Sequence, residues 1–224
     1  MADEPLGLTV HSMPSARQSL GAEGARRTRM GRWKMVAVLL VCAAPVVASY
    51  FTYYVVRPQG DAGYGQLLQP LRPLPAVSAT DRAGAPVDLR SLKGQWLLMS
   101  VAGGACDAVC EQQLYLVRQL RETLGREKAR VDRVWLVDDA QPVPQRLDHG
   151  LAGATVLRVP PAALAAWLPP AEGHQAREHV FLVDPIGNLM MRFPARMDAA
   201  GAARAKRDLE RLLRASASWD EEGR

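Results

Sequence analysis

The feature that most limits how this chain can fold is an uncharged run from Met35 to Val56. The run holds 22 residues, most of them apolar. At about 1.5 Å per residue, a helix of this length spans the hydrocarbon core of a bilayer. We therefore expect a transmembrane helix over residues 35–56. A cleaved signal peptide is the alternative, because Val46-Val47-Ala48 resembles a cleavage site inside the run.

Basic residues gather just before this run and set its expected orientation. Residues 1–34 carry six Lys and Arg side chains against three acidic ones, a net charge of +3, which leaves +2 of the total of +5 elsewhere. Because cytoplasmic segments are enriched in positive charge, we expect a disordered basic tail over residues 1–34 in the cytoplasm. The rest of the chain is then expected outside the cytoplasm. The lipid bilayer is an expected partner, and no nucleic acid is expected.

The remainder of the chain divides by composition into three parts. Residues 57–79 are rich in Pro and Gly, which predicts a semi-extended linker between the membrane and a folded domain. Residues 80–216 carry the periodic apolar segments of one domain, and residues 217–224 form a C-terminal tail. We expect a single-pass protein with one domain outside the cytoplasm.

Hydrophobic periodicity predicts the order of elements in this domain. Short apolar runs indicate strands at residues 96–102, 131–137, 180–183 and 189–193, with a further extended piece at 155–159. Helical periodicity is present at residues 106–124, 162–168 and 198–216. This order is a βαβ unit followed by ββα, which predicts an α/β sheet with helices on both faces.

Two cysteines lie where the first strand leads into the first helix. Gly103 and Gly104 end the strand, and Cys106 and Cys110 follow four residues apart, so both thiols can meet on one helix face. A helix N-terminus favours the thiolate form, which predicts an exposed, attacking Cys106 and a buried, resolving Cys110. A two-thiolate metal clip and a static disulfide are the other readings of this spacing. Cys42 lies in the membrane run and is expected to act as apolar filler.

The segment from Thr80 to Leu98, followed by Cys-x-x-x-Cys, resembles the Sco/SenC branch of the thioredoxin fold. The similarity extends over roughly residues 80–216. Sco proteins are membrane-tethered and hold copper with two cysteines and a distal histidine during cytochrome c oxidase assembly. The resemblance therefore implies a thioredoxin-like domain, copper(I) as a cofactor, and oxidase subunits or assembly factors as partners. It places Cys106 and Cys110 at the two cysteine positions.

The chain departs from the Sco pattern at two places. The family has proline after each cysteine, where this chain has Asp107 and Glu111, and the family's histidine position aligns with Ala176. His174 and His179 flank that position, and we favour His174 over His179 as the third copper ligand. Met190-Met191 offers thioethers, but in a strand one of the two must face the core, which favours packing.

The residues predict a membrane-anchored protein that handles thiols or copper(I) at the cysteine pair. The resemblance to Sco proteins further implies an anchor in a bacterial inner membrane, a periplasmic domain and a role in cytochrome c oxidase assembly. One alternative is a membrane-tethered thiol–disulfide oxidoreductase that acts by mixed-disulfide exchange. The other is a scaffold without catalytic activity that holds a partner through its fold and tether.

Overall fold

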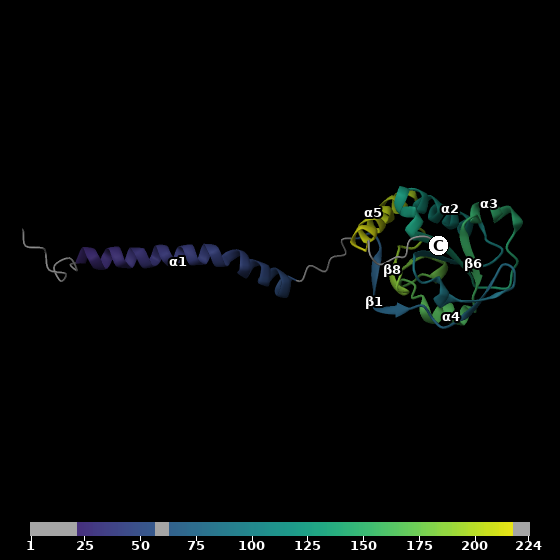
Figure 1. Cartoon of the computed structure of the whole chain (residues 1–224), viewed down its shortest axis with the longest axis horizontal. Helices are drawn as coiled ribbons and strands as arrows, with labels where there is room; N and C mark the ends of the chain where they lie inside the picture. The colour runs from purple at the N-terminus through teal and green to yellow at the C-terminus, as the bar shows by residue number, and fades with distance from the viewer. Residues whose placement is uncertain (1–21, 57–62, 217–224) are drawn as a thin grey trace, which may run out of the picture. The chain divides into compact units, whose positions relative to one another are not determined.

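The structure, a computed structural model, describes residues 22–56 and 63–216, which fall into two separate units (Figure 1). The first unit is helix α1 (Ala22–Phe51), continued by the short π-helical segment η2 (Thr52–Val56). Within it, Thr28–Val55 is long and apolar enough to cross a membrane. The predicted apolar helix is therefore present.

Helix α1 begins earlier than the uncharged run. Residues 22–34 are helical, although the sequence analysis assigned them to a disordered tail, so that prediction is wrong over this part. This stretch holds four Arg and two Ala, which are strong helix formers and extend the helix beyond the apolar segment. The other predicted tail residues, 1–21 and 217–224, lie outside the described residues.

The second unit is built on an eight-stranded sheet in the order β1-β8-β7-β4-β5-β6-β2-β3. The central strands β4, β5 and β6 run parallel, and the other neighbours pair antiparallel. The strands are β1 (Gln66–Pro73), β2 (Ser78–Asp81), β3 (Pro86–Asp88), β4 (Trp96–Ala102), β5 (Val131–Val137), β6 (Ala154–Arg158), β7 (Val180–Val183) and β8 (Asn188–Arg192).

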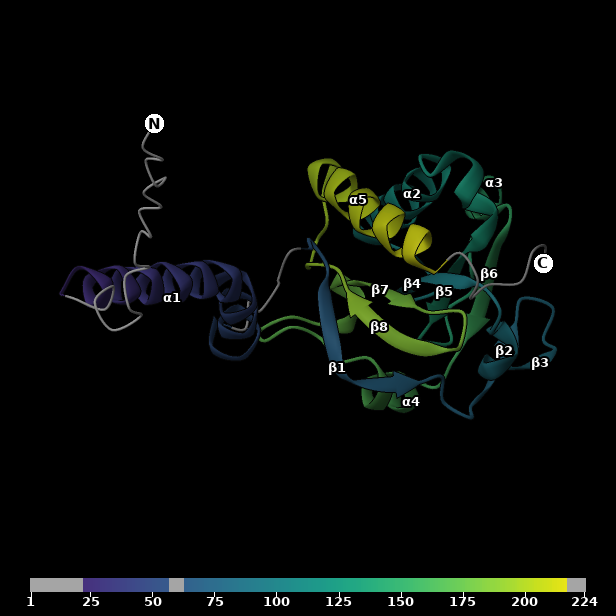
Figure 2. The same cartoon turned by 60° about the vertical axis from the view of Figure 1, so that its left-hand side comes forward.

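Helices cover both faces of the sheet. The α-helices of this unit are α2 (Ala108–Glu122), α3 (Asp148–Leu151), α4 (Pro161–Trp167) and α5 (Ala199–Ala215). Short 3-10 turns are η3 (Leu89–Leu92), η4 (Gly125–Arg130), η5 (Gln145–Leu147) and η6 (Ala176–Glu178). Figure 2 shows α2 and α5 together on one side of the sheet and α4 on the other. The predicted α/β architecture of βαβ followed by ββα is confirmed.

Strand β4 shows why the sequence folds into these layers. Alternate side chains of a strand point to opposite faces. Trp96 and Leu98 pack in the cluster that includes α2 and α5, while Leu97 and Met99 pack in the cluster that includes α4. All four are buried. The strand is therefore apolar throughout, as expected for a strand covered on both faces.

The domain begins before residue 80, so the predicted linker over residues 57–79 is wrong from residue 63 onward. Strand β1 pairs antiparallel with β8, and Leu74 is buried in the core. The prolines argue against a strand in the sequence, because proline has no N–H to donate within a sheet. They are tolerated in β1 because β1 is an edge strand, where one side of the backbone needs no partner. Residues 57–62 lie outside the described residues.

Candidate functional site

The loop between β4 and α2 brings the two cysteines together. Cys106 and Cys110 form a disulfide with their Cα atoms 5.2 Å apart. Cys106 lies just before the helix with a left-handed backbone (φ 48°), and Cys110 is in the first turn of α2. Asp107 is the N-cap, and its carboxylate accepts a hydrogen bond from the Cys110 N–H at 2.9 Å. The helix N-terminus therefore holds one cysteine inside its first turn and the other immediately outside.

Both cysteines are buried. Cys106 is 3% exposed and Cys110 is 5% exposed, and they pack with Ala102 and Trp135. The prediction that Cys110 faces inward is confirmed, whereas the prediction that Cys106 is exposed is wrong. Cys106 lies outside the helix, in a turn closed by its own N–H to the Gly103 carbonyl at 3.1 Å, and packs into the apolar cluster.

The disulfide lines a pocket of about 840 Å³. One wall comes from residues 102–113, at the end of β4 and the start of α2, and another from the segment before β7. Buried as they are, both cysteines still border open space from which a small molecule or a peptide side chain can approach. The charged lining residues are Asp107, Asp139, Arg177, Glu178 and Arg196.

Asp139 fixes the glycines that precede the cysteines. Its carboxylate accepts hydrogen bonds from the backbone N–H of Gly104 at 2.8 Å and of Gln141 at 3.0 Å. A Cβ atom at Gly103 would collide with the same carboxylate, and one at Gly104 would collide with the Gln141 carbonyl. Glycine is therefore required at Gly104, where the obstacle is backbone, whereas a side chain at Gly103 would displace the Asp139 carboxylate that holds the loop.

Arg146 ties the cysteine loop to the loop that follows β5. Its guanidinium donates to the carbonyl oxygen of Cys106 at 3.1 Å and to the Glu111 carboxylate at 2.6 Å. This contact holds the backbone of Cys106 in place and neutralises the acidic residue nearest to the disulfide in α2. No local sequence pattern indicates this role of Arg146, because Arg146 and Glu111 are 35 residues apart along the chain.

His179 is a structural residue in this fold. It is 0% exposed, its Nδ1 lies 2.9 Å from the carbonyl oxygen of Phe193, and its Nε2 accepts from the Ala171 N–H at 3.1 Å. Burial lowers the pKa of His179, so the ring is neutral. Since a carbonyl can only accept, Nδ1 carries the proton and both ring nitrogens are occupied. The predicted ligand His179 has no nitrogen free for a metal.

His174 lies beside the pocket but does not line it. Its Nδ1 is 2.9 Å from the Glu178 carboxylate, and its side chain is 40% exposed. The Gln175 N–H, the His174 ring and the Arg196 guanidinium lower the pKa of Glu178 to about 2. Within residues 22–56 and 63–216, no group of three or more His, Cys, Asp or Glu side chains is placed to hold a metal ion.

Met197 is a further sulfur donor at the pocket, and no sequence pattern indicates it. It follows β8, lines the same pocket as both cysteines, and is 8% exposed. Its thioether is a soft ligand suited to copper(I). Met190 and Met191, by contrast, pack in or against the apolar cluster under α5, as expected for core residues. Cys42 lies in α1, in the other unit.

The fold and the disulfide at the start of α2 define a thioredoxin-like protein. Residues 96–216 match the family described as "Transmembrane-like, thioredoxin-like, C-terminal domain". Because the match spans more than half of the 224 residues, the chain belongs to this family. No curated protein matches the sequence.

Solved structures with a similar fold include Sco1 proteins. Yeast Sco1 is 14% identical with a TM-score of 0.53, over 66% of this chain and 97% of that chain. Copper-bound yeast Sco1 is 14% identical with a TM-score of 0.51, over 65% of this chain and 98% of that chain. Apo Sco1 from Thermus thermophilus is 21% identical with a TM-score of 0.50, over 67% of this chain and 97% of that chain. The predicted Sco-like thioredoxin fold is confirmed, and identities this low establish the fold alone.

Proposed function

We propose that this protein is a membrane-anchored thiol-handling protein whose Cys106–Cys110 pair cycles between disulfide and dithiol. The observation that carries the proposal is that the disulfide lines the 840 Å³ pocket at the N-terminus of a helix. A purely structural disulfide needs no such access, and one that closes only a five-residue loop contributes little stability.

The exchange reaction follows from the positions of the two sulfurs. A thiolate of a partner protein attacks the Cys106 sulfur, a new S–S bond forms, and the Cys106–Cys110 bond breaks. Cys110 leaves as a thiolate in the first turn of α2, where the helix N-terminus stabilises negative charge. A second thiolate of the partner then attacks the mixed disulfide, so that the partner is oxidised by two electrons and Cys106 is released reduced.

Copper(I) handling by the reduced pair is the second candidate function. Cys106, Cys110 and Met197 line one pocket and supply two thiolates and a thioether, a donor set that copper(I) prefers. Solved structures of copper-bound Sco1 from yeast and copper-bound ScoI from Arabidopsis thaliana have the same fold. In this candidate the third ligand is Met197, in place of His174 or His179. The Sco resemblance further supports a role in cytochrome c oxidase assembly.

Anchoring and orientation form part of the proposal. The apolar segment Thr28–Val55 supports membrane insertion, and the basic residues Arg29, Arg32 and Lys34 support a cytoplasmic N-terminus. The domain then lies in the periplasm, where an oxidising environment allows disulfide chemistry.

Trapping of the mixed disulfide tests the proposed exchange. Cys110→Ser leaves Cys106 without a resolving thiol, so incubation with oxidised glutathione is expected to give a stable adduct on Cys106, detected by mass spectrometry of the full chain in detergent. Cys106→Ser is expected to give much less adduct, and Cys42→Ser is the matched control that retains wild-type exchange. Equal adduct formation by both pocket variants, or a native disulfide that dithiothreitol cannot reduce, contradicts the proposal. Full support of oxidase assembly by the double variant Cys106→Ser/Cys110→Ser favours a scaffold instead.

A further inference from the structure

Helix α5 presents a narrow stripe of arginines to solvent. Arg204, Arg207, Arg211 and Arg214 are exposed and recur at intervals of three and four residues, which places them on one face of the helix. The opposite face, with Leu209 and Leu213, is buried against the sheet. The stripe is therefore a surface feature that the core packing of α5 does not require.

The acidic residues of α5 do not cancel this charge. Asp208 is buried, and one of its carboxylate oxygens accepts the backbone N–H groups of Tyr64 at 2.6 Å and Gly65 at 2.9 Å. Glu210 lies 3.5 Å from Lys206, a cation outside the stripe. The other Asp208 carboxylate oxygen lies 3.8 Å from the Arg211 guanidinium and offsets part of the charge there. The stripe keeps a positive charge through the exposed guanidinium groups of Arg204, Arg207 and Arg214.

Three of the arginines surround a shallow pocket. Arg204, Arg207 and Arg211 line a pocket of about 350 Å³ together with Gly63, Tyr64 and Asp208. The guanidinium of Arg204 lies 4.5 Å from the centre of the Tyr64 ring, which holds this side chain at the pocket wall. Guanidinium groups bind phosphate through paired hydrogen bonds, and several of them around one hollow fit a phosphate head group.

We propose that this α5 pocket binds the head groups of anionic phospholipids. The choice of a lipid rests on where the pocket lies along the chain. It is built on Gly63 and Tyr64, and only residues 57–62 separate these from the end of the apolar helical unit at Val56. The proposed insertion of that helix in a bilayer leaves only six residues of the chain between this pocket and the membrane-spanning unit. The pocket therefore meets lipid head groups at a high local concentration. This inference goes beyond the proposed thiol chemistry, which uses a different pocket.

Vesicle binding by the isolated domain tests the proposal. The three buried clusters of the described residues are built from residues 64–213, so a chain of residues 63–216 contains each of them in full. This domain is expected to sediment with vesicles of phosphatidylcholine and phosphatidylglycerol in equal parts, and not with phosphatidylcholine alone. Arg207→Gln/Arg211→Gln is expected to weaken binding roughly thirtyfold, because each arginine near an anionic surface contributes about 1 kcal/mol. The single change Arg207→Gln, at an exposed position, is expected to weaken it roughly fivefold.

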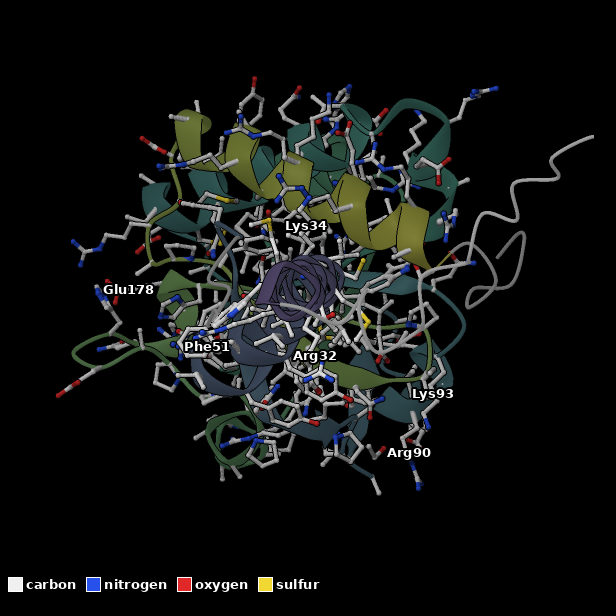
Figure 3. The ribbon with its side chains drawn as sticks, turned by 90° about the vertical axis from the view of Figure 1, so that its left-hand side faces the viewer. Arg32, Lys34, Phe51, Arg90, Lys93 and Glu178 are labelled. Atoms are coloured by element: carbon white, nitrogen blue, oxygen red, sulfur yellow. A yellow bond between two sulfur atoms is a disulfide. The ribbon has the colours of Figure 1, made fainter. Side chains whose placement is uncertain are left out.

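A control variant at two other arginines distinguishes binding at a defined site from attraction by the net charge of the domain. Arg82→Gln/Arg90→Gln removes the same charge near β2 and β3, at the end of the sheet away from β1. Figure 3 shows Arg90 on the far side of the domain from α5. This control pair is expected to leave binding within about twofold of wild type. Equal loss in both pairs, or equal binding to zwitterionic vesicles, overturns the proposal.

Discussion

The cysteine loop and the histidine loop border one pocket but use their polar atoms in different ways. In the cysteine loop, residues 103–110, hydrogen bonds to the backbone fix the chain, and both cysteines line the pocket with their sulfurs bonded to each other. In the histidine loop, residues 174–179, both nitrogens of His179 and one nitrogen of His174 are taken by neighbouring groups. This difference shows that a reactive side chain can take part in chemistry only where the fold does not use its reactive atoms in structural hydrogen bonds.

Replacing His179 is expected to give the largest change in stability. His179→Ala removes two buried hydrogen bonds, strands the Ala171 N–H and the Phe193 carbonyl, and leaves a cavity. We expect a loss of about 3 kcal/mol in the free energy of unfolding, measured by urea titration. His174→Ala, at an exposed position, is the matched control and is expected to cost less than about 0.5 kcal/mol. If His179→Ala keeps wild-type stability but no longer binds copper(I), His179 is a metal ligand and the difference between the two loops does not hold.

Replacing Met197 tests whether the metal donors come from the pocket. Met197→Leu keeps the size and apolar character of the side chain but removes the thioether. We expect the affinity of the reduced protein for copper(I) to fall at least roughly tenfold in a competition with a chelator. Met191→Leu is the control, because Met191 is a core residue, and His174→Ala is expected to have no effect. Unchanged affinity in Met197→Leu removes Met197 from the donor set without affecting the proposed thiol exchange.

The pH dependence of stability tests whether His179 is a neutral, buried core residue. Burial lowers its pKa from the ordinary value of 6.5, so below that pH the unfolded chain binds a proton that the native chain does not. Stability is therefore expected to be greatest above pH 6.5 and to fall as the pH decreases. His179→Gln is expected to flatten this part of the curve, whereas His149→Gln, at an exposed position in α3, is expected to leave it unchanged. A curve that rises on acidification contradicts a neutral, buried His179.

The smallest effect is expected from the ion pair beside the disulfide. Arg146→Gln leaves the Glu111 carboxylate unpaired near the cysteines, which disfavours a thiolate at Cys106. We expect alkylation of the reduced protein at neutral pH to slow roughly threefold in Arg146→Gln and to accelerate by a similar factor in Glu111→Gln. The effects are small because these side chains are 55% and 42% exposed. Equal slowing by both single variants contradicts an electrostatic role.

The sequence predicts the elements that depend on local patterns. The strand at Trp96, the helix after Cys106 and the hairpin between Val180 and Phe193 are each specified by apolar periodicity and by neighbouring glycine, proline or capping residues. The structure places them as expected. Strand β1 was missed because only its pairing with β8, more than 100 residues later, makes it a strand. The proline-rich sequence of β1 does not indicate that it pairs with β8.

The candidate site was predictable only in part. The spacing of Cys106 and Cys110 is local, and their pairing follows from the helix that contains the second one. The roles of Arg146, Met197 and His179 depend on contacts between segments that are distant in sequence. Periodicity can place a residue on a strand or in a loop, but it cannot show which atoms its nitrogen or sulfur will meet.

The reduction potential of the Cys106–Cys110 pair tests the central proposal most directly. It can be measured by equilibrating the purified protein with thiol buffers of known potential and counting alkylated cysteines by mass spectrometry. A pair that exchanges electrons with partner thiols is expected to have a potential between about −120 and −270 mV, the range of thiol–disulfide oxidoreductases. A potential below about −300 mV, typical of structural disulfides, contradicts the account.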